Sequence, residues 1–501
     1  MRLSSHLVII CLGASILAFR PLSSQTDYNF QDDPIAAMLD SLVQVNIFEK
    51  TPKPVSGSAK FNYAPDSIPR FTTAIVQQRL SKLDATSPFD LVYNEQVGSY
   101  IEMYAYRKRN LMSKVLGLSE LYFPMFEQTL DKYDLPLELK YLAVIESALN
   151  PTIKSRAGAM GLWQFMYGTG KLYGLKVTSY VDERCDPIQA TEAACEYLQF
   201  LYETFGDWQM ALAAYNCGPG NINKAIRRSG GKKTYWEIRP YLPKETQGYV
   251  PSFIAVTYVM SFAAEHNLYA LSPKKTFFQV DTLHVKQPVS FRQISSVLDI
   301  PVEDLEYLNP VYRKNHIPFT GEEIQVLTLP VAKVGSFIAN EAAIYKFIKE
   351  DSLLAQMITK EVQKTHYVKN GEKINSIANK YKCTVADIMA WNGLKSYKLK
   401  TGQKLVVYVP VKNTTASTAP TANNSTVPKT KVVTPQDKTY ANNNAVTDGK
   451  FKIHTIKKGD NLWTLAQTYG TTVEELKRLN SFGKYYNLVP GQKIKVGLEK
   501  T

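Results

Sequence analysis

Histidine and cysteine are scarce in this chain of 501 residues. It contains 6 His and 5 Cys, and no His occurs between residues 7 and 265. A Ser-His-Asp triad, a Cys-His pair and a His-ligated zinc site each need an imidazole near the reactive centre, so none of them can be built within that stretch alone. Five Cys are also too few for a disulfide framework in a chain of this length. Carboxylate chemistry remains.

Only one long apolar run lies near the N-terminus. Residues 7–19 follow Arg2 and suit the core of a secretory signal, but they are too few to span a membrane. We therefore predict a signal peptide over residues 1–24 and an exported protein of the periplasm or cell envelope. Cys11 lies inside the run behind Ile10, where a lipid-attachment signal needs a small residue, so a lipid anchor is the less favoured interpretation.

The charge is one-sided. With 59 Lys and Arg against 45 Asp and Glu, the formal net charge at pH 7 is +14. A basic surface favours anionic partners such as nucleic acid, an acidic wall polymer or anionic lipid. Export argues against nucleic acid and favours peripheral association with the cell envelope. Neither a metal nor an organic cofactor is indicated, and oligomeric state is not predicted.

Helical patterning dominates the first half. We predict a leader or linker over residues 25–70, which ends in a stretch interrupted by prolines. Apolar residues then recur every three or four residues, which predicts one α domain over 71–270. The clearest helix start is at Asp186, a capping carboxylate followed by Pro187 in the first turn. We predict that this helix runs to about Tyr202.

The C-terminal part repeats a pattern of strand, two short helices and strand. In each copy an apolar residue precedes an Asn by 24 residues, and a Gly follows: Val285, Asn309 and Gly321; Val368, Asn392 and Gly402; Ile456, Asn480 and Gly491. This period predicts three βααβ modules, over 279–330, 364–410 and 452–498. Residues 411–450 are rich in Thr, Asn, Ala and Pro, which predicts a disordered linker that lets the last module bind independently.

Glu146 is the carboxylate that stands out. It lies four residues after Leu142 and three before Leu149, so helical spacing places an acid on an apolar face. Desolvation there raises the pKa and keeps the carboxyl protonated near neutrality, ready to donate a proton. The alternative is an acid at a helix end that pairs with Lys or Arg.

Two later segments combine glycines with aromatic and amide groups. They are Gly158–Met166, with the sequence GAMGLWQFM, and Ala214–Gly220, with the sequence AYNCGPG. Flat rings stack on sugars and amides bind hydroxyl and N-acetyl groups. Trp163 and Phe165 are residue types that more often belong to a core.

Together with Glu146-Ser147 and the segment Glu245–Pro251, these motifs occur in the order found in lytic transglycosylases. Over residues 111–267 the chain resembles the membrane-bound lytic murein transglycosylase D family. The resemblance implies a mainly α, lysozyme-like domain of the goose-type and soluble lytic transglycosylase class. Its substrate would be peptidoglycan, cleaved between N-acetylmuramic acid and N-acetylglucosamine with 1,6-anhydromuramyl ends. It further implies Glu146 as the single catalytic acid/base, Ser147 as its orienting residue, and these cleft residues: Gln164, Tyr215, Asn216 and Tyr249.

The repeats resemble LysM modules, which bind glycans containing N-acetylglucosamine. The glycan-binding turn is implied at Gly371-Glu372 in the second copy and at Gly459-Asp460 in the third. In the first copy Gln287-Pro288-Val289 replaces the Gly-acid turn, which favours a structural spacer.

Several alternatives stay open. The reaction could be hydrolysis by a goose-type muramidase, or the chain could be a non-catalytic wall-binding scaffold. A second catalytic acid would come from Asp182, Glu183 or Asp186, although Asp186 has a capping role and Asp182-Glu183 is interpreted as a solvated loop. Three cysteines of the helical domain allow one disulfide or free buried thiols, with no pairing preferred: Cys185, Cys195 and Cys217.

Overall fold

The computed structural model describes residue 48, residues 51–319, 324–347, 361–394 and 396–410, and, near the C-terminus, residues 451–456, 465, 468–469, 471, 473–480 and 491–498. The predicted signal peptide with Cys11, the linker over 411–450, and Gly321, Gly459 and Asp460 lie outside the described residues. Among the described residues, no helix combines the length and the apolarity needed to cross a membrane.

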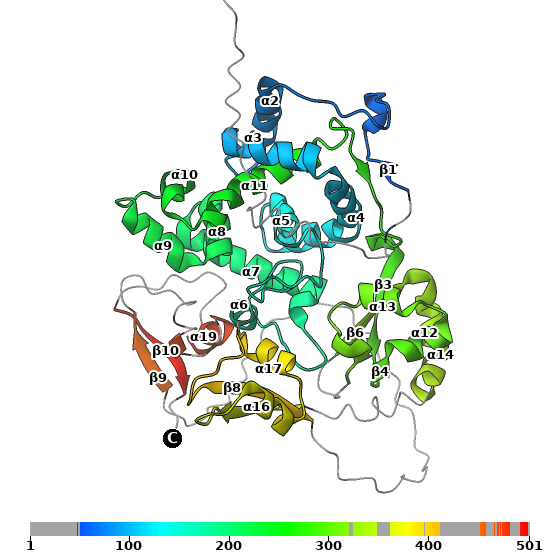
Figure 1. The fold of residues 1–501 in the computed structure, drawn as a ribbon, viewed down its shortest axis with the longest axis vertical. Helices are drawn as coiled ribbons and strands as arrows, with labels where there is room; N and C mark the ends of the chain where they lie inside the picture. The colour runs from blue at the N-terminus through cyan, green and yellow to red at the C-terminus, as the bar shows by residue number, and fades with distance from the viewer. Residues whose placement is uncertain are drawn as a thin grey trace, which may run out of the picture.

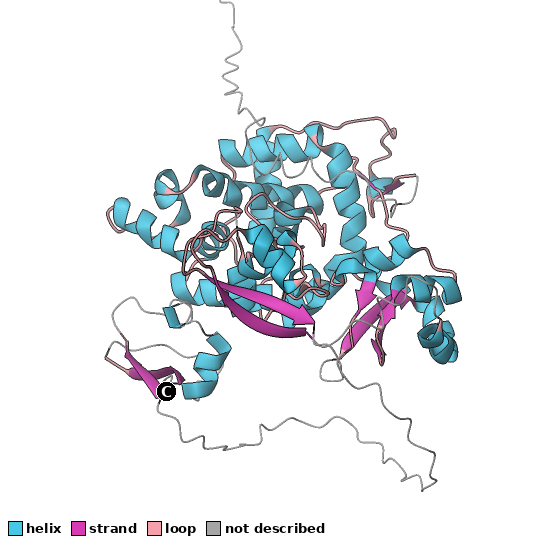
Figure 2. Ribbon diagram, turned by 60° about the horizontal axis from the view of Figure 1, so that its bottom comes forward, coloured by secondary structure: helices cyan, strands magenta, loops and turns pink. Residues whose placement is uncertain are grey.

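The first unit is helical from residue 73 to residue 261 (Figures 1 and 2). Its α-helices are α2 (Thr73–Asp84), α3 (Glu95–Glu102), α4 (Arg109–Lys132), α5 (Leu142–Ser147), α6 (Tyr167–Leu172), α7 (Pro187–Phe205), α8 (Trp208–Cys217), α9 (Pro219–Arg228), α10 (Tyr235–Ile238) and α11 (Lys244–Ser261). Short 3-10 turns occur at Ser58–Lys60, Leu137–Tyr141, Glu183–Cys185 and Arg239–Tyr241, and a π turn at Met103–Arg107 joins α3 to α4. Strand β1 (Lys53–Pro54) pairs antiparallel with β2 (Tyr269–Ala270), which closes the unit beside its own leader.

The predicted start of α7 is confirmed. The Asp186 carboxylate accepts hydrogen bonds from the N–H groups of Ile188 and Gln189, at 2.8 and 2.9 Å, and Pro187 occupies the first turn. The helix continues to Phe205, three residues past the predicted end, and stops where Gly206 takes a left-handed conformation with φ 68°.

The helices pack around α5, which is central in the unit (Figure 1). Helix α11 contacts α3, α5 and α8, and most of its residues are buried, including Tyr249, Phe253 and Tyr258. Each fully buried large apolar side chain stabilises the fold by about 1.5–3 kcal/mol. The short α5 is therefore held by α11 and by the 3-10 turn over Leu137–Tyr141.

The first copy of the repeat forms a module with one extra helix. It comprises β3 (Val280–Val285), β4 (Val289–Ser290), α12 (Phe291–Leu298), α13 (Val302–Leu308), β5 (His316–Ile317), β6 (Gln325–Pro330) and α14 (Val331–Lys346), preceded and interrupted by the 3-10 turns Phe277–Gln279 and Arg313–Asn315. Strand β3 pairs antiparallel with β6, and α14 packs on α12 and on this sheet. The module thus extends past the predicted boundary at residue 330.

The other two copies are smaller. The second has β7 (Glu361–Tyr367), α16 (Ile374–Tyr381), α17 (Val385–Asn392) and β8 (Lys404–Pro410), with β7 and β8 antiparallel. In the third, the described elements are β9 (Phe451–Thr455), α19 (Val473–Asn480) and β10 (Lys493–Leu498), with β9 and β10 antiparallel. The βααβ prediction is confirmed in the second copy, where both helices are described.

The repeated Asn has the same structural role in all three copies. Asn392 ends α17, where its side-chain amide donates to the Val406 carbonyl at 2.7 Å and accepts from the Val406 N–H at 2.6 Å. Asn309 brackets Thr328 of β6 in this way, and Asn480 brackets Lys495 of β10. The side chain therefore fastens the second helix to the closing strand, which explains why the spacing repeats.

A loop of the helical unit lies against the first two modules. Val181 belongs to the apolar core of the first module, and Val177 to that of the second. Between the two modules, Arg313 Nη2 lies 3.1 Å from Asp387 Oδ1. The first two modules are therefore packed on the helical unit as well as connected to it by the chain.

Candidate active site

Glu146 lies at the end of a helix that is only six residues long. Helix α5 follows a 3-10 turn and stops after Ser147, because Ala148 and Leu149 both adopt left-handed conformations, with φ 45° and 63°. The sequence expectation of one helical face running from Leu142 to Leu149 is therefore wrong, since Leu149 is outside the helix. Left-handed backbone costs non-glycine residues about 1–2 kcal/mol each, and such strain is typical of functional sites.

Glu146 is half-buried, and the protein around its carboxyl desolvates it. Burial raises its pKa to about 8, the negative charge of Glu245 adds to the rise, and a hydrogen bond from the Tyr249 hydroxyl to Oε1 opposes it. Tyr249 comes from α11 and is 2% exposed. At neutral pH this carboxyl is therefore mainly protonated and can donate a proton.

A tight turn over residues 158–165 lies next to α5. Met160 and Phe165 exchange backbone hydrogen bonds across it, both at 3.1 Å, and Gln164 has φ 47°. The Gln164 amide donates to the carbonyls of Gly161 and Ile153, at 2.9 and 3.1 Å. This amide therefore shapes the turn, while the cleft role that the resemblance implies for Gln164 stays a prediction.

Two predicted residues connect this turn to the helices around Glu146. The Ser147 hydroxyl is fully buried and lies 2.9 Å from the carbonyl oxygens of both Ala143 and Leu162. The Tyr215 hydroxyl, on α8, donates to the Trp163 carbonyl at 2.8 Å. Burial, with the Glu146 charge as the next cause, holds the pKa of Tyr215 well above its usual value, so Tyr215 lies within electrostatic reach of Glu146.

Asn216 is held by a residue that the sequence interpretation missed. Thr246 on α11 donates its hydroxyl proton to Asn216 Oδ1 at 2.7 Å. A signal for Thr246 was available, because it precedes Tyr249 by three residues and so shares its helix face. The structure thus brings the predicted residues of α5, α8 and α11 and of the 158–165 turn into one region.

Trp163 and Phe165 are core residues. Trp163 is 0% exposed, packs against Phe126 and donates its indole N–H to Thr191 at 2.9 Å. Phe165 is 2% exposed. Neither ring is free to stack on a sugar in this conformation.

The three alternative acids all have partners within the protein. Asp182 is buried and forms a two-pronged ion pair with Arg184, at 2.9 and 2.7 Å, so the expectation of a solvated loop is wrong for this residue. Glu183 accepts a hydrogen bond from the Lys176 N–H at 2.7 Å, and Asp186 caps α7. The sequence around Asp182 and Glu183 has no apolar periodicity, so it did not indicate that the first module covers this loop.

The three cysteines of the helical domain, Cys185, Cys195 and Cys217, are free thiols. Cys185 and Cys195 are buried, and burial raises the pKa of both. Burial also raises the pKa of Cys217 to about 11. Of the two sequence alternatives, the structure has free thiols.

In the second module, Gly371 and Glu372 form the turn after β7. Gly371 has φ 72°, which favours glycine, and Glu372 Oε2 accepts from the Lys369 N–H at 2.9 Å and lies 2.8 Å from His366 Nε2. Glu372 therefore holds the turn in shape. Its contact with glycan stays a prediction.

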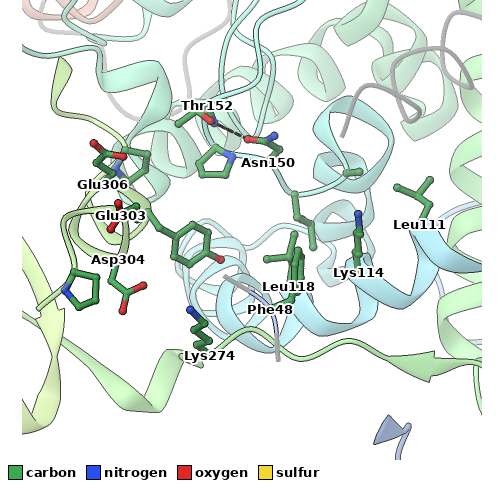
Figure 3. Close-up of a pocket in the computed structure, with 16 residues that line it drawn as sticks. Phe48, Leu111, Lys114, Leu118, Asn150, Thr152, Lys274, Glu303, Asp304 and Glu306 are labelled. Carbon is green, nitrogen blue, oxygen red and sulfur yellow. Dashed lines mark hydrogen bonds between the residues drawn. The ribbon is translucent and has the colours of Figure 1, made fainter. Parts of the chain in front are cut away.

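A cavity of about 610 Å³ lies between the helical unit and the first module (Figure 3). Its wall includes basic and acidic side chains: Lys114 of α4, Lys274, and Glu303 and Asp304 of α13. Among the described residues its lining includes Ala148, two residues after Glu146, but not Glu146, Tyr215 or Tyr249. The cavity is thus distinct from the surroundings of the Glu146 carboxyl.

Known protein families match most of these units. The transglycosylase SLT domain matches residues 124–238, the LysM-like domain of lytic transglycosylase MltD matches 279–346, and the LysM domain matches 366–407 and 454–497. The chain therefore contains a transglycosylase SLT domain and LysM-type modules. The predicted fold class is confirmed: a mainly helical SLT domain precedes LysM modules.

Two named relatives and one solved structure are similar to parts of this chain. The SLT-domain protein is 28% identical to the membrane-bound lytic murein transglycosylase D of Escherichia coli K12 over 405 residues, covering 80% of this chain and 81% of that protein. It is 36% identical to the soluble lytic murein transglycosylase of the same strain over 118 residues, covering 22% and 18%. The solved 70 kDa soluble lytic transglycosylase of E. coli matches with 28% identity and a TM-score of 0.25, covering 31% of this chain and 27% of that chain.

Proposed function

We propose that this SLT-domain protein is a lytic transglycosylase of peptidoglycan, with Glu146 as its catalytic acid and base. The observation that carries the proposal is a carboxyl with a pKa of about 8 at the end of α5, within the SLT domain. The names of two relatives, both lytic murein transglycosylases, support the reaction class.

The proposed reaction uses one carboxyl twice. Protonated Glu146 gives its proton to the glycosidic oxygen as the bond from that oxygen to the muramyl C1 breaks, and positive charge develops at C1. The muramyl 6-hydroxyl then attacks C1 and loses its proton to the Glu146 carboxylate. The products are an N-acetylglucosamine end and a 1,6-anhydromuramyl end, the carboxyl is protonated again, and no water is consumed. The enzyme would thus be a carbon–oxygen lyase.

The contacts of the site supply what this cycle needs. Burial keeps the acid form present at neutral pH, and the Tyr249 hydroxyl stabilises the carboxylate after the proton has left. The three alternative acids are occupied by Arg184, by the Lys176 N–H and by the start of α7. A two-carboxylate hydrolysis through these residues is therefore disfavoured.

We further propose that the LysM modules hold the enzyme on its polymeric substrate. Modules that each bind weakly raise the local concentration of the catalytic domain along a glycan strand. Export to the periplasm or cell envelope, with peripheral association, fits this role and the name of the membrane-bound relative. Removal of residues 411–501 should then reduce activity on intact sacculi more than activity on short soluble glycans.

Product analysis tests the reaction. Mass spectrometry of murein digested by the full chain should show 1,6-anhydromuramyl ends, and Glu146→Gln should abolish them. Reducing muramyl ends alone would establish hydrolysis by a goose-type muramidase. If the unaltered protein binds glycan but does not cleave it, the protein is a non-catalytic scaffold.

A further inference from the structure

A buried ion pair lies on the loop that carries none of the proposed catalytic groups. Arg184 and Asp182 are each 3% exposed, and the guanidinium meets both carboxylate oxygens, at 2.9 Å from Nε and 2.7 Å from Nη2. Burying two charges costs free energy that their attraction only partly returns, so such a pair is weak evidence for stability. Its two-pronged geometry instead fixes the direction in which the remaining guanidinium N–H groups point.

Those N–H groups point at the turn beside Glu146. Arg184 Nη1 donates to the Gly158 carbonyl at 3.3 Å and to the Phe165 carbonyl at 3.5 Å, the two ends of the turn. The backbone of Arg184 is pressed against the middle of the same turn, because a Cβ placed on Gly161 would lie 1.8 Å from the Arg184 carbonyl oxygen. Arg184 therefore contacts the turn at both ends and at its centre.

This turn in its turn contacts the residues around Glu146. Its Leu162 carbonyl receives the Ser147 hydroxyl, and its Trp163 carbonyl receives the Tyr215 hydroxyl. A shift of the turn would thus move the end of α5 and the Tyr215 ring together. Displacements of about 1 Å in an active site can cost about 100-fold in rate.

The loop of Arg184 is braced from the other side by the first module. The Asp182 N–H donates to the Val311 carbonyl at 2.9 Å, and the Arg313 N–H donates to the Tyr180 carbonyl at 2.7 Å. The Arg313 guanidinium donates to the Thr178 carbonyl at 2.9 Å and pairs with Asp387 of the second module. Val181 is packed into the core of the first module. The loop is therefore clamped between the modules and the turn.

We infer that Arg184 is a positioning residue for Glu146, and that the first LysM-like module serves as a brace that keeps the loop of Arg184 against the active-site turn. The inference rests on the proposed function. It gives a role to the copy whose sequence lacks the glycan-binding turn. Loosening the brace lowers turnover even on substrates too short to engage any LysM module.

The test uses the full chain and a short soluble murein glycan. Arg184→Lys keeps the charge and loses the two-pronged pairing. Arg313→Ala removes the side-chain contacts of the brace to Thr178 and Asp387, from a side chain that is 27% exposed, and leaves the backbone bonds of the loop in place. The matched control is Lys286→Ala, which breaks an exposed ion pair with Glu341 within the same module. We expect kcat to fall by about 10- to 100-fold for Arg184→Lys, by a smaller factor for Arg313→Ala, and not for Lys286→Ala, with KM changed less than kcat.

The pH profile separates positioning from plain destabilisation. The described groups that face the Glu146 carboxyl are Tyr249 and Glu245 from α11 and Tyr215 from α8. When the turn moves, water reaches this carboxyl, so the basic limb of kcat against pH should shift to lower pH in both brace variants and stay in place in Lys286→Ala.

Unchanged kcat and an unchanged basic limb in folded Arg313→Ala would overturn the inference, and this variant decides the matter if Arg184→Lys fails to fold. A failure of the proposed function would be seen in a different experiment, the product analysis, where Glu146→Gln would still cleave murein.

Discussion

The Tyr249 hydroxyl, on α11, donates a hydrogen bond to the Glu146 carboxylate at the end of α5, although 103 residues separate them in the chain. This contact places a donor on the conjugate base of a carboxyl that burial keeps protonated. Acid and donor together let one residue release and recover a proton near neutrality.

The first prediction concerns pH. With a pKa of about 8, the acid form of Glu146 is lost as pH rises through 8, so kcat/KM should fall on the basic side near that value. A basic limb below pH 6 would contradict the proposed environment. Initial rates on a soluble glycan between pH 5 and 10 provide the measurement.

The free energy of unfolding should also depend on the titration of Glu146. The folded-state pKa of Glu146 lies above the unfolded value of 4.5, so the folded protein binds the proton more tightly and loses stability as pH rises from about 4.5 to about 8. Each unit of pKa difference corresponds to about 1.4 kcal/mol at a fully buried site, and partial exposure reduces this. Glu146→Gln should therefore gain stability over the unaltered protein between pH 5 and 8 in urea unfolding; parallel curves would show an unperturbed carboxyl.

Tyr249→Phe removes the donor to Glu146. Since that donor stabilises the carboxylate, its loss should raise the pKa further, move the basic limb to higher pH and lower kcat by about 10-fold or more. Tyr258→Phe is the control, because Tyr258 is buried in the same helix but bonds Arg79 and His266. Equal effects of both variants on the pH profile would remove the special role of Tyr249.

Ser147→Ala should loosen the turn. The variant leaves the buried Leu162 carbonyl without its partner, which should cost about 1–3 kcal/mol of unfolding free energy and lower kcat as well. Ser119→Ala, which loses a bond within α4 alone, should cost less in thermal unfolding and leave kcat unchanged. A Ser147→Ala protein with normal kcat would restrict this hydroxyl to stability.

Asn392→Ala tests the bracket of the second module. It removes the bonds to both backbone groups of Val406, so β7 and β8 should lose amide protection in hydrogen exchange, while the exposed Asn375→Ala should not. Protection that persists in Asn392→Ala would show that strand pairing alone holds the module.

The sequence predicted those features whose cause is local. Asp186 with Pro187 specifies a helix start through neighbouring N–H groups, and the recurring Asn reports a contact repeated in each module. The end of α5 could not be predicted this way. The apolar spacing continues to Leu149, but tertiary packing and the left-handed conformations of Ala148 and Leu149 end the helix at Ser147.

Long-range contacts explain what the sequence interpretation missed. Val177, Val181 and Asp182 occupy a loop without apolar periodicity, and the first and second modules that cover it begin about 100 and about 180 residues later in the chain. The pairing of Thr246 with Asn216 likewise depends on how α8 and α11 meet. From the sequence, only the order of the motifs, which resembles that of lytic transglycosylases, indicated that these distant segments belong together.

Gly161 limits any redesign of the turn over residues 158–165. Its φ of 87° and the nearness of the Arg184 carbonyl leave no room for a side chain, so saturation libraries should leave this codon fixed. At Gly158 no atom lies within 4 Å of where a Cβ would stand, so a side chain there meets only the strain of its φ of 91°, and Asn, which tolerates left-handed backbone, is the first substitution to try in this turn.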